Sequence, residues 1–192
     1  INITVTPYGG NPSLFASFGA CPINTTMACS KSSVFSSQEP AGLERLAMSP
    51  ADDGWNCSSP PCDLCIGVAG ETDSAFSLLV TQRANATVQL SPGQPQGGFA
   101  SAGAAIHYTY PAHMLERGLT VTLNALSGSP YVVYRKDLPP TTDTHDGYGL
   151  AGAPIVVPAN PSLCGGGHCE AVVYITVYGG ETDAQYTLSA QG

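Results

Sequence analysis

Apolar and polar residues alternate along several short stretches of the chain with a period of two. The clearest stretch is residues 119–123, where Leu119, Val121 and Leu123 alternate with two threonines. Residues 172–178 form a nearly continuous apolar run of the kind found in a central strand. No stretch combines a sustained helical period with capping residues. The pattern therefore predicts an all-β protein made of short antiparallel strands.

Turn residues divide these predicted strands into two sets. In the second half we expect seven strands, at residues 87–90, 105–110, 119–123, 131–134, 155–157, 172–178 and 185–189. In the first half we expect five, at residues 1–7, 13–18, about 43–48, 63–69 and 75–82. Many short strands separated by Gly-, Pro- and Ser-containing turns are typical of an antiparallel β-sandwich.

The chain also repeats itself. Residues 70–78 recur 110 residues later as residues 180–188, beginning with the same Gly-Glu-Thr-Asp sequence, and residues 3–12 align with residues 121–130. A repeat on this scale indicates two copies of one domain. Position 1 corresponds to position 119, so the stretch from about residue 86 to residue 118 has no counterpart in the first copy.

We therefore predict two tandem antiparallel β-sandwich domains of jelly-roll-like form, at residues 1–82 and 83–192, the first lacking its two N-terminal strands. A sandwich without these strands has open backbone edges, which must be covered by strands from a neighbouring molecule or an upstream repeat. Because the chain begins without Met or a signal-like segment, we expect it to be a processed piece of a longer product.

Composition narrows the classes of partner. Only 10% of the residues are charged, and six basic residues give a net charge of −8. A chain of this kind has no basic patch to meet nucleic acid or an anionic membrane. Its longest apolar run is far shorter than a membrane span, so we expect none.

Seven cysteines indicate an oxidising, extracellular compartment. The simplest pairing joins neighbours in the sequence: Cys21–Cys29, Cys57–Cys62 and Cys164–Cys169. Cys65 is then unpaired. It aligns with Ile175 of the second copy, which favours a buried free thiol; a covalent link to another chain, or a zinc cluster of Cys57, Cys62, Cys65 and His168, are the alternatives.

Four sequons indicate covalent N-linked glycans, at Asn2, Asn24, Asn56 and Asn85. The Ser- and Pro-containing patches at residues 58–61 and 139–142 are candidates for O-linked sugar. Both features agree with a secreted or cell-surface glycoprotein.

We find no catalytic site in the sequence and expect neither an enzyme nor a cofactor. The four histidines are scattered and match no nucleophile or metal motif. Asp143, His145 and Asp146 are candidates for a cation site, with a solvated turn as the alternative. Glu and Asp recur in the turn at residues 71–73 and 181–183, which indicates a turn requirement more than an acid–base pair.

The second copy resembles the bacterial pre-peptidase C-terminal family of β-sandwiches, found in large secreted proteins. The resemblance rests on residues 119–123, 128–134, 173–180 and 186–188. Ser129 and Tyr131 depart from the family pattern where an acidic pair often stands, so the resemblance implies no calcium role here. It implies an accessory module for adhesion or spacing, without chemistry of its own.

These features leave three hypotheses. The first is a structural subunit of an extracellular filament or surface appendage, assembled head-to-tail from copies of itself by β-strand complementation. The second is a carbohydrate-binding or adhesive accessory module of a larger secreted protein, and the third is a secreted enzyme. Aromatic residues that could stack on sugar in the second case are Trp55, Tyr108, Tyr110, Tyr131, Tyr134 and Tyr148.

Overall fold

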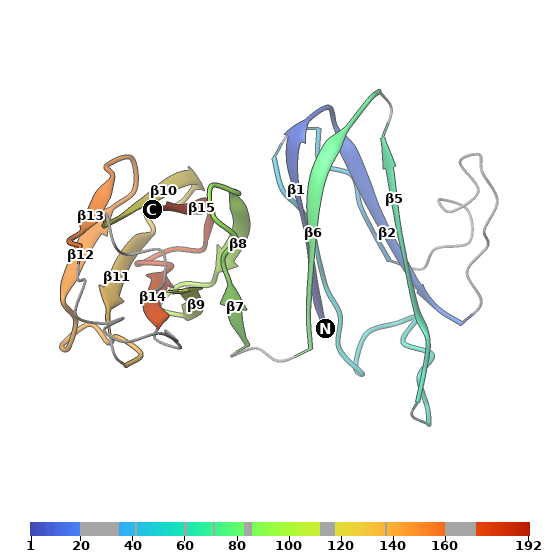
Figure 1. The fold of residues 1–192 in the computed structure, drawn as a ribbon. Helices are drawn as coiled ribbons and strands as arrows, with labels where there is room; N and C mark the ends of the chain where they lie inside the picture. Colours follow the sequence, from blue (N-terminus) through green and yellow to red (C-terminus); the bar gives the residue numbers. More distant parts are fainter. Residues whose placement is uncertain are drawn as a thin grey trace, which may run out of the picture. The chain divides into compact units, whose positions relative to one another are not determined.

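The protein consists of two compact units, Ile1–Ala84 and Asn85–Gly192, which we call unit 1 and unit 2. The sequence placed the boundary two residues earlier, between positions 82 and 83. The computed structural model describes residues 1–19, 35–40, 42–59, 61–70, 72–82, 86–111, 118–136, 138–159 and 172–192. Over these residues both units are built from β-strands without a helix (Figure 1), which confirms the predicted all-β sandwich fold.

Unit 1 contains two three-stranded sheets. Their strand orders are β4-β1-β6 and β3-β2-β5, and all pairs are antiparallel. The strands are β1 (Asn2–Gly9), β2 (Pro12–Phe18), β3 (Phe35–Ser37), β4 (Glu44–Ala47), β5 (Leu64–Gly70) and β6 (Ala75–Thr81). The core between the sheets is centred on Ile3, Val5, Leu14, Ala16 and Leu46.

Unit 2 contains a four-stranded sheet, β13-β10-β15-β8, and a five-stranded sheet, β12-β11-β14-β9-β7. The strands are β7 (Thr87–Gln89), β8 (Gln96–Ala100), β9 (Ala105–Pro111), β10 (Leu119–Ser127), β11 (Tyr131–Arg135), β12 (Gly147–Leu150), β13 (Ile155–Val157), β14 (Val172–Tyr178) and β15 (Ala184–Gln191). All pairs are antiparallel except β7 with β9, which is parallel.

Three described strands were not predicted: β3, β8 and β12. The last two are rich in glycine, so they carry little of the apolar alternation on which the prediction depended. Their glycines are required by packing. A Cβ atom at Gly98 would lie 2.5 Å from the ring of Tyr186, and one at Gly147 would lie 2.6 Å from the ring of Tyr134. Large neighbouring side chains therefore fill the space above these glycines.

Strand pairing shows which elements of the two units correspond. Val5 on β1 lies opposite Leu78 on β6, and Leu123 on β10 lies opposite Leu188 on β15. A β-bulge falls at the same place in both, between Pro7 and Gly9 of β1 and between Ala125 and Ser127 of β10. By the same comparison β2, β4 and β5 match β11, β13 and β14. Strands β7, β8 and β9 have no counterpart among the described residues of unit 1.

A glycine in the left-handed region follows each bulged strand. Gly10 has a φ of 73° and Gly128 a φ of 72°. At Gly10 a Cβ atom would lie 2.6 Å from the carbonyl oxygen of Asp73, and at Gly128 it would collide with the carbonyl oxygen of Asp183. The repeated acidic turn thus packs against a repeated glycine, and this contact fixes the turn between β5 and β6 and the turn between β14 and β15.

Candidate assembly site: the open side of unit 1

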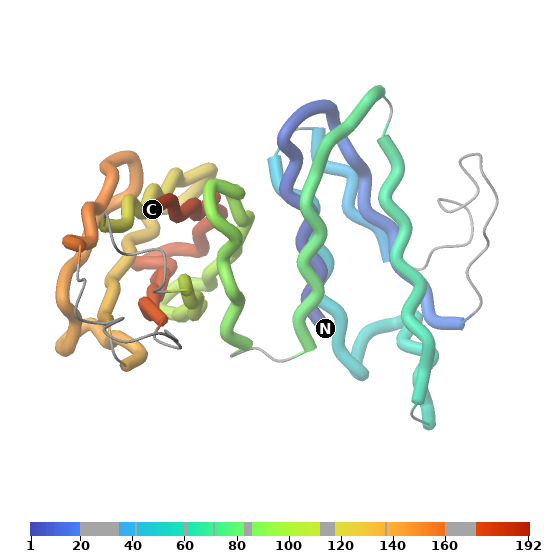
Figure 2. Tube along the Cα trace, viewed as in Figure 1, coloured from blue at the N-terminus to red at the C-terminus, as the bar shows by residue number. Residues whose placement is uncertain are grey.

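The edges of two strands distinguish unit 1 from unit 2. In unit 2, β15 pairs with β10 on one side and β8 on the other, while β14 lies between β11 and β9. In unit 1 the corresponding strands, β6 and β5, each end a sheet. No strand within the described part of the chain pairs with their outer edges. These two strands are consecutive and belong to different sheets (Figure 2), so we call the side they border the open side of unit 1.

The open side exposes a row of apolar side chains. Phe76, Leu78 and Val80 on β6 are 40%, 44% and 41% exposed. Their registers opposite Pro7, Val5 and Ile3 place them on the face of the sheet that carries the core residues Ile3 and Val5. These side chains therefore line the interior of an incompletely covered sandwich.

The matching row of unit 2 is fully buried. Tyr186, Leu188 and Ala190 of β15 occupy the positions of Phe76, Leu78 and Val80, and each is 0% exposed.

The strand β5 repeats the contrast on the other sheet. Leu64, Ile66 and Val68 are only partly buried against the core of unit 1, whereas the corresponding side chains of β14 are completely buried: Val173, Ile175 and Val177.

The register of β5 also corrects the sequence alignment. Ala16 pairs with Ile66, and its equivalent Tyr134 pairs with Ile175. Ile66 therefore takes the place of Ile175. The prediction that Cys65 aligns with Ile175 is wrong by one position, because the two repeats differ by one residue around the turn that follows.

In unit 2 the strands β8 and β9 close this side as a β-arch, meaning two strands joined by a turn that pair with different sheets. The hydroxyl groups of Tyr108 on β9 and Tyr186 on β15 are 2.9 Å apart and hydrogen-bonded in the core. Burial raises the pKa of Tyr108 to about 12 and the pKa of Tyr186 well above its usual value of 10.0. This hydrogen bond links β9 of the arch to β15 of the opposite sheet.

The turn of the arch is fixed by the repeated acidic turn. The backbone N–H of Ala102 donates a hydrogen bond of 2.9 Å to Oδ1 of Asp183. Two backbone hydrogen bonds add to it, from Gly103 N to Gly180 O at 2.9 Å and from Gly179 N to Ala104 O at 3.1 Å. Sequence reasoning assigned the recurrent Asp to its own turn, and it missed this partner 81 residues away. Asp73, its equivalent in unit 1, is exposed.

In unit 1, a buried carboxyl group lies on β4, at the edge of the sheet β4-β1-β6 that is opposite β6. Glu44 on β4 is 1% exposed, and its Oε1 accepts a hydrogen bond of 2.9 Å from the backbone N–H of Glu39. Its Oε2 has no hydrogen-bond partner among the described residues. Burial raises the pKa of Glu44, while the hydrogen bonds from Ser37 and Glu39 oppose that shift. No pattern in the sequence distinguished this residue.

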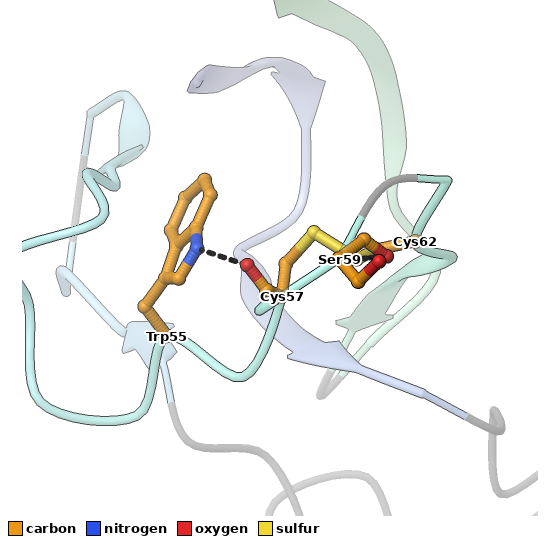
Figure 3. Close-up of a disulfide and its surroundings, with 4 residues drawn as sticks. All are labelled: Trp55, Cys57, Ser59 and Cys62. Carbon is orange, nitrogen blue, oxygen red and sulfur yellow. Dashed lines mark hydrogen bonds between the residues drawn. A yellow bond between two sulfur atoms is a disulfide. The ribbon is translucent and has the colours of Figure 1, made fainter.

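The predicted bridge between Cys57 and Cys62 is present, with the Cα atoms 5.7 Å apart. The indole Nε1 of Trp55 donates a hydrogen bond of 3.2 Å to the Cys57 carbonyl oxygen (Figure 3). The ring of Trp55 also packs on Phe18, with centroids 4.6 Å apart. Trp55 therefore ties the small disulfide loop to β2.

The prediction that Cys65 is unpaired is wrong, because Cys65 is disulfide-bonded. Its sulfur, like those of Cys57 and Cys62, is oxidised and is no thiolate ligand, which removes the proposed zinc cluster. The predicted pairs Cys21–Cys29 and Cys164–Cys169, and His168, lie outside the described residues.

Two of the four predicted glycosylation sites can be placed. Asn56 is exposed and directly precedes Cys57 of the disulfide. Asn2 begins β1 and is half-buried, and Thr4 of its sequon is buried. Asn24 and Asn85 lie outside the described residues.

The structure does not gather the three candidate cation ligands into a site. Asp146 accepts a hydrogen bond of 2.9 Å from the Lys136 backbone N–H, and the His145 ring packs edge-on against Tyr148. Asp143 lies close enough to Tyr178 to help raise its pKa, although burial is the larger cause. Over the described ranges, no group of three or more His, Cys, Asp or Glu residues is arranged to hold a metal ion.

The predicted stacking platforms separate into core and surface residues. Tyr108, Tyr110 and Tyr134 are buried, so they do not face a ligand. Tyr131 stacks on Tyr178 with ring centroids 5.1 Å apart. Tyr148 on the neighbouring strand β12 is 68% exposed, which makes it the best presented of the predicted aromatic residues.

Solved structures include domains that are similar to part of this chain. The chain is similar to the pre-peptidase C-terminal domain of a collagenase from Bacillus anthracis, at 15% sequence identity and a TM-score of 0.39. The similarity covers 58% of this chain and 100% of that domain. No family model and no curated protein matches the chain.

Within the described ranges, no helix has the length and hydropathy needed to cross a membrane.

Proposed function

We propose that the protein is a structural glycoprotein subunit of an extracellular filament or surface appendage. Copies assemble head-to-tail when strands of a neighbouring copy cover the open side of unit 1. The observation that carries the proposal is the row Phe76, Leu78 and Val80, which faces the sandwich interior and is about two-fifths exposed. The same row in unit 2 is sealed by β8 and β9.

The apolar area exposed on this row is large enough to support a stable interface between copies. Covering the three side chains would remove about 200 Å² of apolar surface from water, worth about 5 kcal/mol. Backbone hydrogen bonds along β5 and β6 would add to it, as in other cases of strand addition. Contact between a groove on one copy and strands on the next is heterologous, so it does not form a two-fold dimer, and it extends into a filament when the rotation between copies does not close a ring.

The remaining surface agrees with a secreted assembly. The Cys57–Cys62 bridge and the disulfide at Cys65 suit an oxidising compartment. A glycan on the exposed Asn56 would add solubility to a chain with few charged residues. The proposed assembly involves no cofactor and no catalytic chemistry.

Electron microscopy of two versions of the chain tests the proposal. The first is the chain as it stands, and the second carries a copy of residues 87–118 joined ahead of Ile1. In unit 2 this segment directly precedes Leu119, the equivalent of Ile1, so the copy gives unit 1 the connectivity of unit 2. We expect filaments from the first version and single particles from the second.

A third version, with a Gly/Ser segment of the same length ahead of Ile1, is the control and should still form filaments. Discrete particles from the unmodified chain at every concentration would exclude the proposal. So would filaments that form equally well when the copied strands are present.

A second candidate function is carbohydrate binding by an accessory module. It is favoured by Tyr148, which is exposed beside the stacked pair Tyr131 and Tyr178 on the five-stranded sheet. A glycan array probed with the wild-type chain and with Tyr148→Ala tests it. Binding that disappears in the variant, from a chain that forms no filaments, would favour this function.

A further inference from the structure

We propose that the outer edges of β12 and β13, in unit 2 of a neighbouring copy, occupy the open side of unit 1, with β12 beside β5 and β13 beside β6. This inference rests on the proposed function, because it specifies the partner surface of the same site. Every strand of unit 2 keeps its partners, since the contact uses only edges with which no described strand pairs. The joined sheets would have the orders β3-β2-β5-β12-β11-β14-β9-β7 and β4-β1-β6-β13-β10-β15-β8.

One side of unit 2 presents two such edges. β12 ends the five-stranded sheet and β13 ends the four-stranded sheet. The two strands are consecutive and belong to different sheets, as β5 and β6 are, and four residues separate the strands in each case. Because the two units are copies of one sandwich, both sheets can continue across the joint at the same time.

Exposed apolar side chains concentrate on these two sides. Nine large apolar side chains are exposed among the described residues, and three of them form the inward row of β6. Three more lie on β12 and β13: Tyr148 is 68% exposed, Leu150 64% and Val156 67%. These three are the most exposed of the nine. Two different apolar surfaces, one on each unit, are what a heterologous contact between copies requires.

On the inward face, β5 carries large side chains where β12 carries none. Ile66 and Val68 of β5 pack toward the core of unit 1. The inward residues of β12 are Gly147 and Gly149, which lie opposite core residues of β11. The large inward side chains of β5 would therefore meet no side chain of β12 and have room at the joint.

On the outward face the sizes are reversed. Alternation places Gly67 and Ala69 of β5 on the outward face. On β12 the outward residues are the exposed Tyr148 and Leu150. Large side chains beside small ones can lie across the joint and lose exposed surface without crowding.

A single parallel register satisfies both faces. β5 is antiparallel to β2, and β12 is antiparallel to β11, the strand equivalent to β2. Copies in the same orientation therefore bring β5 and β12 together in parallel, as β7 and β9 pair within unit 2. With Gly67 beside Tyr148, Ala69 lies beside Leu150. Each large residue of this stretch then lies beside a small one.

The same register brings the second sheet together. Because the two turns have equal length, the same shift in numbering places Val157 beside Phe76. Val157 is buried in its own core, so it would cover the end of the exposed row nearest the turn. Pro154 and Pro158 flank β13, which limits its pairing to three residues. The contact between β5 and β12 would therefore provide most of the joint.

Cysteine cross-linking between two versions of the full chain tests the register. One version carries Ala69→Cys and the other Leu150→Cys, and their mixture is oxidised, digested and examined by peptide mass spectrometry. We expect a disulfide between the introduced cysteines of different copies, because neighbouring strands bring side chains on one face within bonding range. A copy of residues 87–118 ahead of Ile1 should abolish it by covering β5 and β6.

The matched control pairs Ala69→Cys with Leu126→Cys. Leu126 is also exposed but lies on β10, away from the proposed joint. This mixture should give less than about a tenth of the cross-linked peptide.

A size test measures the lowest concentration at which filaments form. Ala69→Leu places a second large side chain against Leu150 and should raise this concentration about tenfold. Leu150→Ala in the same chain should return it toward the wild-type value by making room. Ala47→Leu, at an exposed alanine on the edge strand β4, is the control and should leave it unchanged.

The outcomes separate this inference from the proposed function. Filaments that form without the cross-link between positions 69 and 150, or that are insensitive to Ala69→Leu, overturn the inference and leave the proposed function standing. Cross-linked copies from a chain that never forms filaments support the pairing and count against the proposed function. Absence of both the cross-link and the filaments overturns both.

Discussion

A comparison of β6 with β15 shows that the burial of a strand's apolar side chains depends on whether a neighbouring strand covers its edge, and not on its own sequence alone. Both strands carry an inward row of apolar residues, both pair with an equivalent strand (β1 for β6 and β10 for β15), and both follow the same acidic turn. The inward row of β15 is completely buried, while that of β6 is about two-fifths exposed. The difference lies in the edge: β8 covers β15, and no described strand covers β6.

Removing the aromatic ring from each inward row should give the largest difference in stability between the two units. Tyr186→Ala removes a fully buried ring and leaves the Tyr108 hydroxyl without its partner, so we expect unit 2 to lose about 3–5 kcal/mol of unfolding free energy. In the unassembled chain, Phe76→Ala should cost unit 1 only about 1–2 kcal/mol, because two-fifths of the ring is already exposed.

Two probes can follow these losses separately. The single tryptophan, Trp55, lies in unit 1, so its fluorescence reports that unit during denaturation, and hydrogen exchange of β15 reports unit 2. Equal losses from the two variants would show that the Phe76 side chain is covered in solution.

Alkaline pH should sharpen the comparison, because the buried tyrosine pair exists only in unit 2. The folded pKa of Tyr108 is about 12, against 10.0 for an ordinary tyrosine. Its contribution to stability is therefore fully present below pH 10.0 and is lost as the pH rises toward 12, a change of up to about 3 kcal/mol. Denaturant titrations near the two ends of this range, on wild type and Tyr108→Phe, measure it.

We expect unit 2 to lose stability over this range and unit 1 to lose much less, since unit 1 has the single tyrosine Tyr8. The Tyr108→Phe variant should have a flatter pH dependence in unit 2. The same slope in wild type and variant would contradict the assignment.

Replacing the glycine that packs against the repeated acidic turn should destabilise both units by similar amounts. Gly10→Ala and Gly128→Ala each place a Cβ atom at a positive φ and against the backbone of the acidic turn. We expect each to cost about 1–3 kcal/mol in its own unit. The measurement is the denaturation midpoint of each unit, with Gly93→Ala as a control that has a positive φ but open space around it. A large effect in only one unit would mean that the two turns are not equivalent.

The smallest expected effect concerns Glu44, which has no acidic equivalent in unit 2. Its pKa is raised by burial above the ordinary value of 4.5. The stability it contributes is present below pH 4.5 and is lost as the pH rises through the folded pKa. Glu44→Gln should remove this pH dependence from unit 1, as monitored by Trp55 fluorescence, and leave unit 2 unchanged, as monitored by hydrogen exchange of β15. A steeper decline in the variant would contradict the assignment.

The sequence predicted the elements whose own side chains carry the pattern. The alternation at residues 119–123 and the apolar run at residues 172–178 became β10 and β14, because their side chains pack directly into the core. Strands such as β8 were missed because Gly98 contributes space and not a side chain. A position that must be empty for Tyr186 is not recognisable from local hydrophobicity.

The candidate site was predictable in its existence but not in its contacts. That unit 1 has no equivalents of β7, β8 and β9 among its described residues followed from the repeat, since the stretch from about residue 86 to residue 118 has no match in the first copy. The hydrogen bond between Asp183 and Ala102 spans 81 residues, so spacing alone did not reveal it. The disulfide at Cys65 was also missed, because pairing cysteines by their separation in the sequence left this residue over.

The single turn between β5 and β6 has a topological consequence for how the open side is filled. Because these strands are consecutive, the two borders of the open side are joined at one end by a few residues. An arch that adds beside them stacks laterally, turn against turn, as β8–β9 does on β14–β15. It passes no chain end through a closed loop. In the proposed filament, addition and release of a subunit would therefore require neither partner to unthread, and growth would be reversible without unfolding.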